Sequence, residues 1–205
     1  MSRAGKQRAG KERVIWLVRH GETTWNAMGW VQGQIDGARL TRRGRLQARQ
    51  VADRLAEEPI RAVYSSDLYR ARRMAMVAAR RLGCQVRTDH RLRERCFGIA
   101  EGVPSTNISV AVTGIRDGQV VDEHARPPGG ESLYDVHQRC SAFLRQLLGQ
   151  HEDGDAVVVA HGGSIRMLRS LAADTELRGL PWDAVPNASI FRLGLPLPDL
   201  AGSTR

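Results

Sequence analysis

Two segments of this chain end in a histidine and a glycine, and one of them also carries an arginine. Residues 14–18 are apolar and rich in β-branched side chains, and Arg19-His20-Gly21 follows them. Residues 155–160 contain three consecutive valines and are followed by His161-Gly162. A planar guanidinium suits phosphate, and glycine lets a ligand approach the backbone closely. These residue types indicate phosphate chemistry, with a neutral imidazole as the nucleophile.

Taken singly, each motif is equally consistent with a buried strand that ends in a polar turn. Together they favour a functional site, because the carboxyl ends of neighbouring parallel strands meet at one edge of an open sheet, where ligands bind. We therefore expect Arg19, His20 and His161 to lie at one spot.

Strand-like and helix-like segments alternate along the chain. Strands are expected at about 14–19, 62–65, 85–88, 155–160 and 189–193. Helices are expected from the N-cap Thr41 to a stop at Pro59, over 68–82 and 132–148, and from 164 onward. Residues 99–130 are expected to be irregular, with one short helix. This alternation predicts an α/β fold, a three-layer α/β/α sandwich with a mainly parallel central sheet.

One domain is expected over residues 13–197, between a disordered basic tail at 1–12 and a loose C-terminus at 198–205. Hydrophobic residues make up 41% and charged residues 26% of the chain, as in soluble globular proteins. No apolar run is long enough to cross a bilayer, and no apolar segment follows the basic start as in a secretory signal. The scattered cysteines Cys84, Cys96 and Cys140 are interpreted as free thiols, which predicts a cytoplasmic protein without membrane partners.

The formal net charge is +9, and Lys6 and Lys11 are the only lysines, so arginine supplies nearly all the basic charge. Codon usage in a GC-rich genome and a field that attracts anions are both consistent with this composition. Aromatic residues make up only 5% of the chain, and no helix-turn-helix pattern is present. We therefore expect no nucleic-acid partner.

Further short motifs accompany the two histidine motifs. In chain order, the whole set is Arg19-His20-Gly21-Glu22-Thr23, Trp25-Asn26, Gln32-Gly33, Leu40-Thr41 with Gly44, Ser65-Ser66-Asp67-Leu68 with Arg70-Ala71, Leu92-Arg93-Glu94, Gly98 with Glu101-Gly102, Gly129-Gly130-Glu131-Ser132, and Ala160-His161-Gly162-Gly163. With this ordered set, residues 14–193 resemble the histidine phosphatase superfamily, also called the phosphoglycerate mutase-like family. Dimers are common among its members, so the resemblance makes a homodimer an open expectation.

The resemblance implies a catalytic group of His20, Arg19, Arg70, His161 and Glu94. His20 would accept the phosphoryl group, and the two arginines and His161 would surround the charge on its equatorial oxygens. Glu94 would give a proton to the leaving oxygen and later take one from water. Without the resemblance, Arg70 is one of several arginines on a helix surface. Glu94 is equally consistent with an exposed ion-pair partner of its arginine neighbours.

The resemblance also implies a group of residues that bind the substrate. These residues are Thr23, Asn26, Gln32, Gly33 and Gly162. Glu22 and Glu131 are expected behind them, accepting ring N–H bonds from the histidines. The six histidines lack paired metal-ligand spacing, so neither a metal ion nor another cofactor is expected.

Phosphatases and mutases share this core, and the loop after the acid separates them. The stretch from Cys96 to Pro128 is short, Phe97 stands where the mutases have a phenol, and Ser105 stands where they have a lysine. These differences favour a phosphatase that acts on a small phosphomonoester through a phosphohistidine. A phosphoglycerate mutase-type transfer is the alternative, and a non-catalytic phosphate-binding or regulatory protein is the second. The apolar residues 108–115 either line the pocket mouth or pack on the core.

Overall fold

The computed structural model describes residues 12–150 and 154–196. The predicted C-terminal segment 198–205 lies outside the described residues, as does the predicted tail except for Glu12, the first residue of β1.

A five-stranded sheet lies at the centre of the molecule, in the order β3-β2-β6-β1-β7. Its strands are β1 (Glu12–Arg19), β2 (Ile60–Ser65), β3 (Val86–Thr88), β6 (Asp155–Ala160) and β7 (Ile190–Pro196). All neighbouring pairs are parallel except β1 and β7, which run antiparallel. The predicted mainly parallel sheet is confirmed, with β7 three residues longer at its end than expected.

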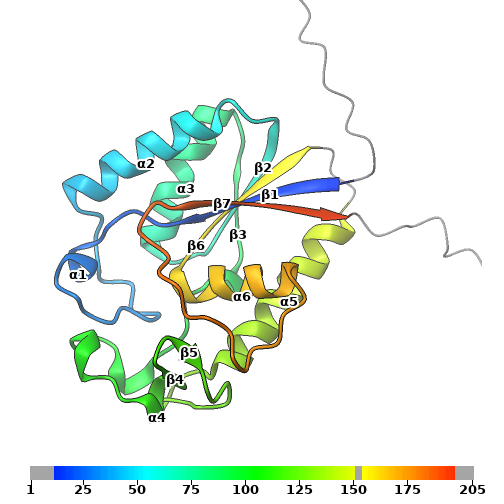
Figure 1. Cartoon of the computed structure of the whole chain (residues 1–205). Helices are drawn as coiled ribbons and strands as arrows, with labels where there is room; N and C mark the ends of the chain where they lie inside the picture. Colours follow the sequence, from blue (N-terminus) through cyan, green and yellow to red (C-terminus); the bar gives the residue numbers. More distant parts are fainter. Residues whose placement is uncertain (1–11, 151–153, 197–205) are drawn as a thin grey trace, which may run out of the picture.

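Helices cover both faces of this sheet, as the predicted sandwich requires (Figure 1). The helices α2 (Arg42–Leu55) and α3 (Tyr69–Leu82) pack on one face, and α5 (Leu133–Gly149) and α6 (Gly162–Ala172) pack on the other. Alternate residues of β1 point to opposite faces, so Val14, Trp16 and Val18 join one core while Ile15 and Leu17 join the other.

The helix ends follow local signals with small differences. Thr41 caps α2 as expected, but the helix ends at Leu55, one turn before Pro59. Gly83 ends α3 in the left-handed conformation, with φ of 69°. Ser132 caps α5. The last helix, α6, begins at Gly162, two residues earlier than expected, directly after His161.

The segments between these elements contain more regular structure than the sequence predicted. Two elements were not expected. One is the short helix α1 (Thr24–Ala27), which follows β1, and the other is a hairpin of β4 (Ile115–Arg116) and β5 (Gln119–Val120). The predicted short helix is α4 (Val110–Thr113), which lies beside the hairpin at one end of the sandwich (Figure 1). Three short 3-10 helices complete this region, at His90–Leu92, Gly98–Ala100 and Ser105–Asn107. Within the described residues, no helix is long and apolar enough to span a membrane.

Candidate active site

The two histidines that follow β1 and β6 lie side by side. Arg19 pairs with Ala160 in the parallel register of these strands, and the His20 backbone N–H donates to the Ala160 carbonyl at 3.0 Å. The imidazole rings of His20 and His161 are therefore neighbours, with centroids 5.1 Å apart at an angle of 60°. The structure places both predicted histidines at one edge of the sheet.

The His20 ring is held in one tautomer. Its Nδ1 lies 2.8 Å from the Gly21 carbonyl oxygen, which can only accept, so Nδ1 carries the proton and Nε2 presents a lone pair. Burial, together with the positive charges of Arg70 and Arg19, holds the His20 pKa well below its usual range. His20 is thus a neutral imidazole whose free nitrogen is Nε2.

His161 is fully buried, and neither of its ring nitrogens has a hydrogen-bond partner among the described residues. Burial and the nearby charge of Arg70 hold its pKa well below the usual range as well. A buried polar group without a partner costs about 1–3 kcal/mol, which makes it a marker of a binding function.

Two arginines, Arg19 and Arg70, lie near the histidines. In each, only some of the guanidinium N–H groups donate hydrogen bonds to described residues. Arg70, at the start of α3, donates from Nη2 to the Gly33 carbonyl at 2.6 Å and from Nη1 to the Ile35 carbonyl at 3.1 Å. Arg19 donates from Nη1 to the Val185 carbonyl. The Nε atoms of both arginines are buried without a partner among the described residues. Burial lowers the pKa of Arg70 to about 10, which still leaves it charged at neutral pH.

Glu94 lies over the first turn of α6. Both oxygens of its carboxylate accept from the Gly163 N–H, at 3.0 and 3.1 Å, and Oε1 also accepts from the Arg95 N–H at 2.8 Å. A Cβ atom at position 163 would lie only 2.2 Å from Oε1, so this approach requires glycine. Its neighbours Arg91 and Arg93 bind Asp89 and Asp67 instead, and no ion pair in the described chain joins either to Glu94.

A pocket of about 320 Å³ opens above these groups. The predicted residues that line it are Arg19, His20, Asn26, Gln32, Gly33, Arg70, Glu94 and Gly162. Thr23 is instead completely buried behind Asn26 and Gln32, and its hydroxyl lies 3.0 Å from the side-chain oxygen of each. Thr23 therefore orients two pocket amides rather than facing the pocket itself.

Asn26 presents its nitrogen to the pocket. Its Oδ1 accepts from the Thr23 N–H and from Nδ2 of Asn187, both at 3.1 Å. The Nδ2 group is consequently the end that is left for a ligand. Asn187 also donates to the His20 carbonyl at 3.1 Å, and nothing in the sequence pointed to it.

The outer part of the pocket is aromatic. Trp30, Phe97 and Trp182 line it together with Val31 and Ser105. The apolar residues 108–115 do not line it.

The buried Arg95 side chain anchors the loop that contains these apolar residues. It donates to the carbonyls of Val112 and Thr113 at 2.9 and 2.7 Å, and also to those of Ala125 and Glu131.

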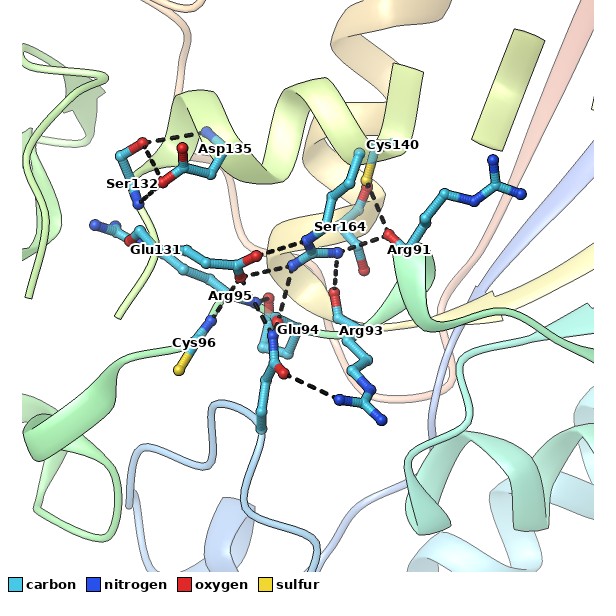
Figure 2. Close-up of polar contacts among 12 residues, drawn as sticks. Arg91, Arg93, Glu94, Arg95, Cys96, Glu131, Ser132, Asp135, Cys140 and Ser164 are labelled. Carbon is cyan, nitrogen blue, oxygen red and sulfur yellow. Dashed lines mark hydrogen bonds and ion pairs between the residues drawn. The ribbon is translucent and has the colours of Figure 1, made fainter. Parts of the chain in front are cut away.

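A charged network holds the backbone that carries Glu94 (Figure 2). Arg139 of α5 donates to the carbonyls of Arg91, Arg93 and Glu94 at 2.6, 2.6 and 3.0 Å. It also pairs with the Glu131 carboxylate at 2.9 Å. Gln34 donates to the same Glu94 carbonyl at 3.1 Å. The side chains of Arg139 and Gln34 thus converge on one short stretch of irregular backbone.

The expectation that Glu22 and Glu131 orient the histidines is wrong. The Glu22 carboxylate accepts from the Thr41 hydroxyl at 2.7 Å, and Glu131 binds Arg139 and the Cys96 N–H. A backbone carbonyl orients His20, as described above.

Glu101 supports the arginine side of the site. Its carboxylate accepts from the N–H groups of Gln34, Ile35 and Phe97 at 2.9, 3.0 and 2.9 Å. This fixes the loop whose carbonyls at Gly33 and Ile35 bind Arg70. Gly33 has a φ of 48°, and a Cβ atom there would lie 2.0 Å from a Glu101 oxygen.

Sequence reasoning also missed Arg166, a further cation of the pocket. It lies one turn into α6, four residues after Gly162, and this spacing from a pocket glycine was the available signal. Among the described residues, no group of three or more histidine, cysteine, aspartate or glutamate side chains is arranged to hold a metal ion.

Comparisons with known proteins agree with this geometry. The family model described as histidine phosphatase superfamily (branch 1) matches residues 15–196. A probable phosphoglycerate mutase GpmB from Erwinia tasmaniensis is 38% identical over 185 residues, which cover 87% of this chain and 83% of that protein. The solved structure of a mycobacterial glucosyl-3-phosphoglycerate phosphatase has a TM-score of 0.78 at 33% identity, covering 89% of this chain and 90% of that one. A structure titled mycobacterial hydrolase 1 has a TM-score of 0.81 at 32% identity, covering 89% and 91%.

Proposed function

Since the chain belongs to the histidine phosphatase superfamily, we propose that it hydrolyses a small phosphomonoester through a phosphohistidine formed on His20. The observation that carries this proposal is the state of the His20 ring. The Gly21 carbonyl holds the proton on Nδ1, so the lone pair of Nε2 is available, and the lowered pKa keeps the ring neutral. A neutral, oriented imidazole is the form that attacks phosphorus.

In the first step, His20 Nε2 attacks phosphorus, the bond to the ester oxygen breaks, and the Glu94 carboxyl gives its proton to the departing alkoxide. In the second step, water attacks phosphorus, the bond to Nε2 breaks, and Glu94 takes the proton from water. One carboxyl group thus acts as acid and then as base. Arg19, Arg70 and His161 surround the transferred group and stabilise the charge on its equatorial oxygens.

The loop after Glu94 favours hydrolysis over mutase-type transfer, in which the phosphoryl group returns to a bound phosphoglycerate. Among the described residues, its pocket side presents Phe97 and Ser105 and no cation besides Arg95. Arg95 itself is occupied by four backbone carbonyls, and Arg126 pairs with Asp135 at 2.7 Å. Mutase-type transfer is the second candidate because relatives such as the Erwinia protein carry that name. A non-catalytic phosphate-binding role is the third.

The test is hydrolysis of p-nitrophenyl phosphate by the wild type and by His20→Ala, each with and without a chelator. We expect turnover that survives chelation and falls at least about 10³-fold in the variant. Quenching the wild type during turnover with alkaline detergent, which preserves the acid-labile P–N bond, should trap phosphate on His20. Persistent activity in His20→Ala would overturn the mechanism. Phosphoglycerate isomerisation faster than hydrolysis would assign the mutase reaction instead, and phosphate binding without either reaction would assign the third role.

A further inference from the structure

A short turn before β7, residues 186–189, reaches back to the main chain of the proposed nucleophile. A hydrogen bond of 3.1 Å between its first and last residues closes the turn. The Ala188 N–H donates to the carbonyls of both Arg19 and His20, at 3.1 and 3.2 Å. Ala188 has a φ of 62°, which is uncommon for a residue other than glycine. Such a conformation persists where the surrounding contacts determine it, and it is concentrated at functional sites.

The side chain of Asn187, in the same turn, joins two parts of the site. Its Nδ2 group donates to the His20 carbonyl and to Oδ1 of Asn26, both at 3.1 Å. An amide nitrogen has two hydrogens, so these two acceptors use both of them. One side chain therefore holds the main chain of the proposed nucleophile and also a side chain that lines the pocket.

Main-chain groups fix the orientation of both amides. The His20 carbonyl can only accept, so the Asn187 atom that faces it is the nitrogen. The Thr23 N–H can only donate, so the Asn26 atom that faces it, at 3.1 Å, is the oxygen. The contact between the two amides is consequently a nitrogen facing an oxygen, and the Asn26 nitrogen is left for the pocket.

The orientation of Asn26 matters because the proposed reaction brings an anion into the pocket. With its nitrogen in the pocket, Asn26 can donate to a phosphoryl oxygen. If the amide were turned by 180°, it would present an oxygen that repels the anion. Its nitrogen would then also face the donors of Thr23 and Asn187. Asn187 thus adds a second donor, from a distant part of the chain, that opposes the turned state.

We propose that Asn187 is a positioning residue, which fixes the Asn26 amide with its nitrogen toward the phosphoryl group while it holds the main chain of His20. This inference rests on the proposed function, because it requires a phosphoryl group beside His20 and Asn26. Asn187 is not among the described residues that line the pocket. It therefore acts through Asn26 rather than on the substrate.

The test is a double-mutant cycle on Asn26 and Asn187, measured by calorimetric titration with inorganic phosphate, so that binding is observed without turnover. Asn187→Leu keeps the size of the side chain and removes its donor. It should raise the phosphate dissociation constant at least about fivefold, the strength of one hydrogen bond. In the Asn26→Ala background, the same substitution should change the constant less than about twofold, because the amide through which Asn187 acts is absent.

The matched control is Ser189→Ala. Ser189 ends the same turn, and its buried hydroxyl has no hydrogen-bond partner in the described part of the chain. This variant should bind phosphate within about twofold of the wild type. Asn187→Ala, which removes the donor without adding an apolar side chain, should show the same coupling to Asn26. Urea unfolding checks that each variant is folded during the titration, and a merely structural role would lower stability without coupling in phosphate binding.

Equal effects of Asn187→Leu in the two backgrounds would overturn the inference, because Asn187 would then not act through Asn26. So would unchanged phosphate binding in Asn187→Leu, or a loss of the same size in Ser189→Ala. Failure of the wild type to bind phosphate would also overturn it. In each of these cases, p-nitrophenyl phosphate hydrolysis that depends on His20 would show that the proposed function stands. Coupling between the two asparagines, with activity that persists in His20→Ala, would instead support this role of Asn187 and overturn the phosphohistidine.

Discussion

The two halves of the candidate site are built in different ways. The phosphoryl half, Arg19, His20, Arg70 and His161, stands at the ends of β1 and β6 and at the start of α3. The acid half, Glu94, stands on irregular backbone that long-range side chains hold in place, chiefly Arg139 and Gln34. Regular sheet geometry places the first half, and individual hydrogen bonds place the second. The two halves should therefore fail differently when single residues are changed.

The largest effect is expected in the phosphoryl half. Arg70→Gln removes a charge beside His20 and should lower kcat/KM by about 10³-fold or more. Because the proposed mechanism places Arg70 on the transferred group, the loss should be equal for an aryl and an alkyl phosphate, such as p-nitrophenyl phosphate and glycerol 3-phosphate. Arg72→Gln, an exposed neighbour on α3, serves as the control. A loss confined to one class of leaving group would show that Arg70 does not act on the phosphoryl group alone.

A smaller and more selective effect is expected in the acid half. Arg139→Met removes the cation paired with Glu131 and one donor from each of three carbonyls, so the free energy of unfolding should fall by about 2–4 kcal/mol. Glu94 should then be displaced, and kcat/KM, which reports the first step, should fall about 10²-fold for glycerol 3-phosphate but less than tenfold for p-nitrophenyl phosphate, whose leaving group needs no acid.

Steady-state kinetics and urea unfolding measure these two changes. Arg145→Met, an exposed arginine on the same helix, should leave both nearly unchanged. An equal loss of kcat/KM for both substrates would show that Arg139 acts on the phosphoryl half instead.

The smallest effect concerns pH. The pKa values of His20 and His161 are well below the usual range, mainly because both rings are buried. In the unfolded chain they bind protons near pH 6.5, so the unfolded state binds more protons than the native state below that pH. The free energy of unfolding should therefore fall as pH drops from about 7.5 to about 5.5, by roughly 1 kcal/mol for each histidine.

Urea titrations at the two pH values measure this decline. It should be smaller in His161→Asn, which removes one of the two groups. The same histidines predict that the acid limb of kcat/KM lies below pH 6.5, since the nucleophile stays neutral there. An unchanged decline in His161→Asn would show that other groups dominate the response.

Sequence reasoning found Arg19, His20 and His161 of the phosphoryl half because their signals are local. A buried strand that ends in Arg19-His20 and another that ends before His161 are visible as short apolar runs, and parallel sheet geometry brings their ends together. The sandwich followed from the same alternation of strands and helices. Arg70 and Glu94 were named only through the resemblance, and the structure brings both to the pocket.

What the sequence could not predict depends on contacts between distant residues. Arg139 binds carbonyls 45 to 48 positions away, and Glu101 binds N–H groups 66 and 67 positions away. Such contacts have no periodicity, so nothing in the order of residues marks them. The same limit explains the misplacement of Thr23, whose hydroxyl turns inward to Gln32. The tautomer of His20 depends on the orientation of a single carbonyl, that of Gly21.

The Arg95 contacts have a consequence for how this protein can diverge. All four acceptors of its guanidinium, at Val112, Thr113, Ala125 and Glu131, are main-chain carbonyls. Every amino acid supplies a carbonyl, so substitutions in the loop do not remove this anchor as long as the backbone keeps its path. Side chains in this loop can therefore change while Arg95, next to Glu94, keeps its four hydrogen bonds. A single buried arginine thus ties the path of this loop to its main chain and leaves its side chains free to differ.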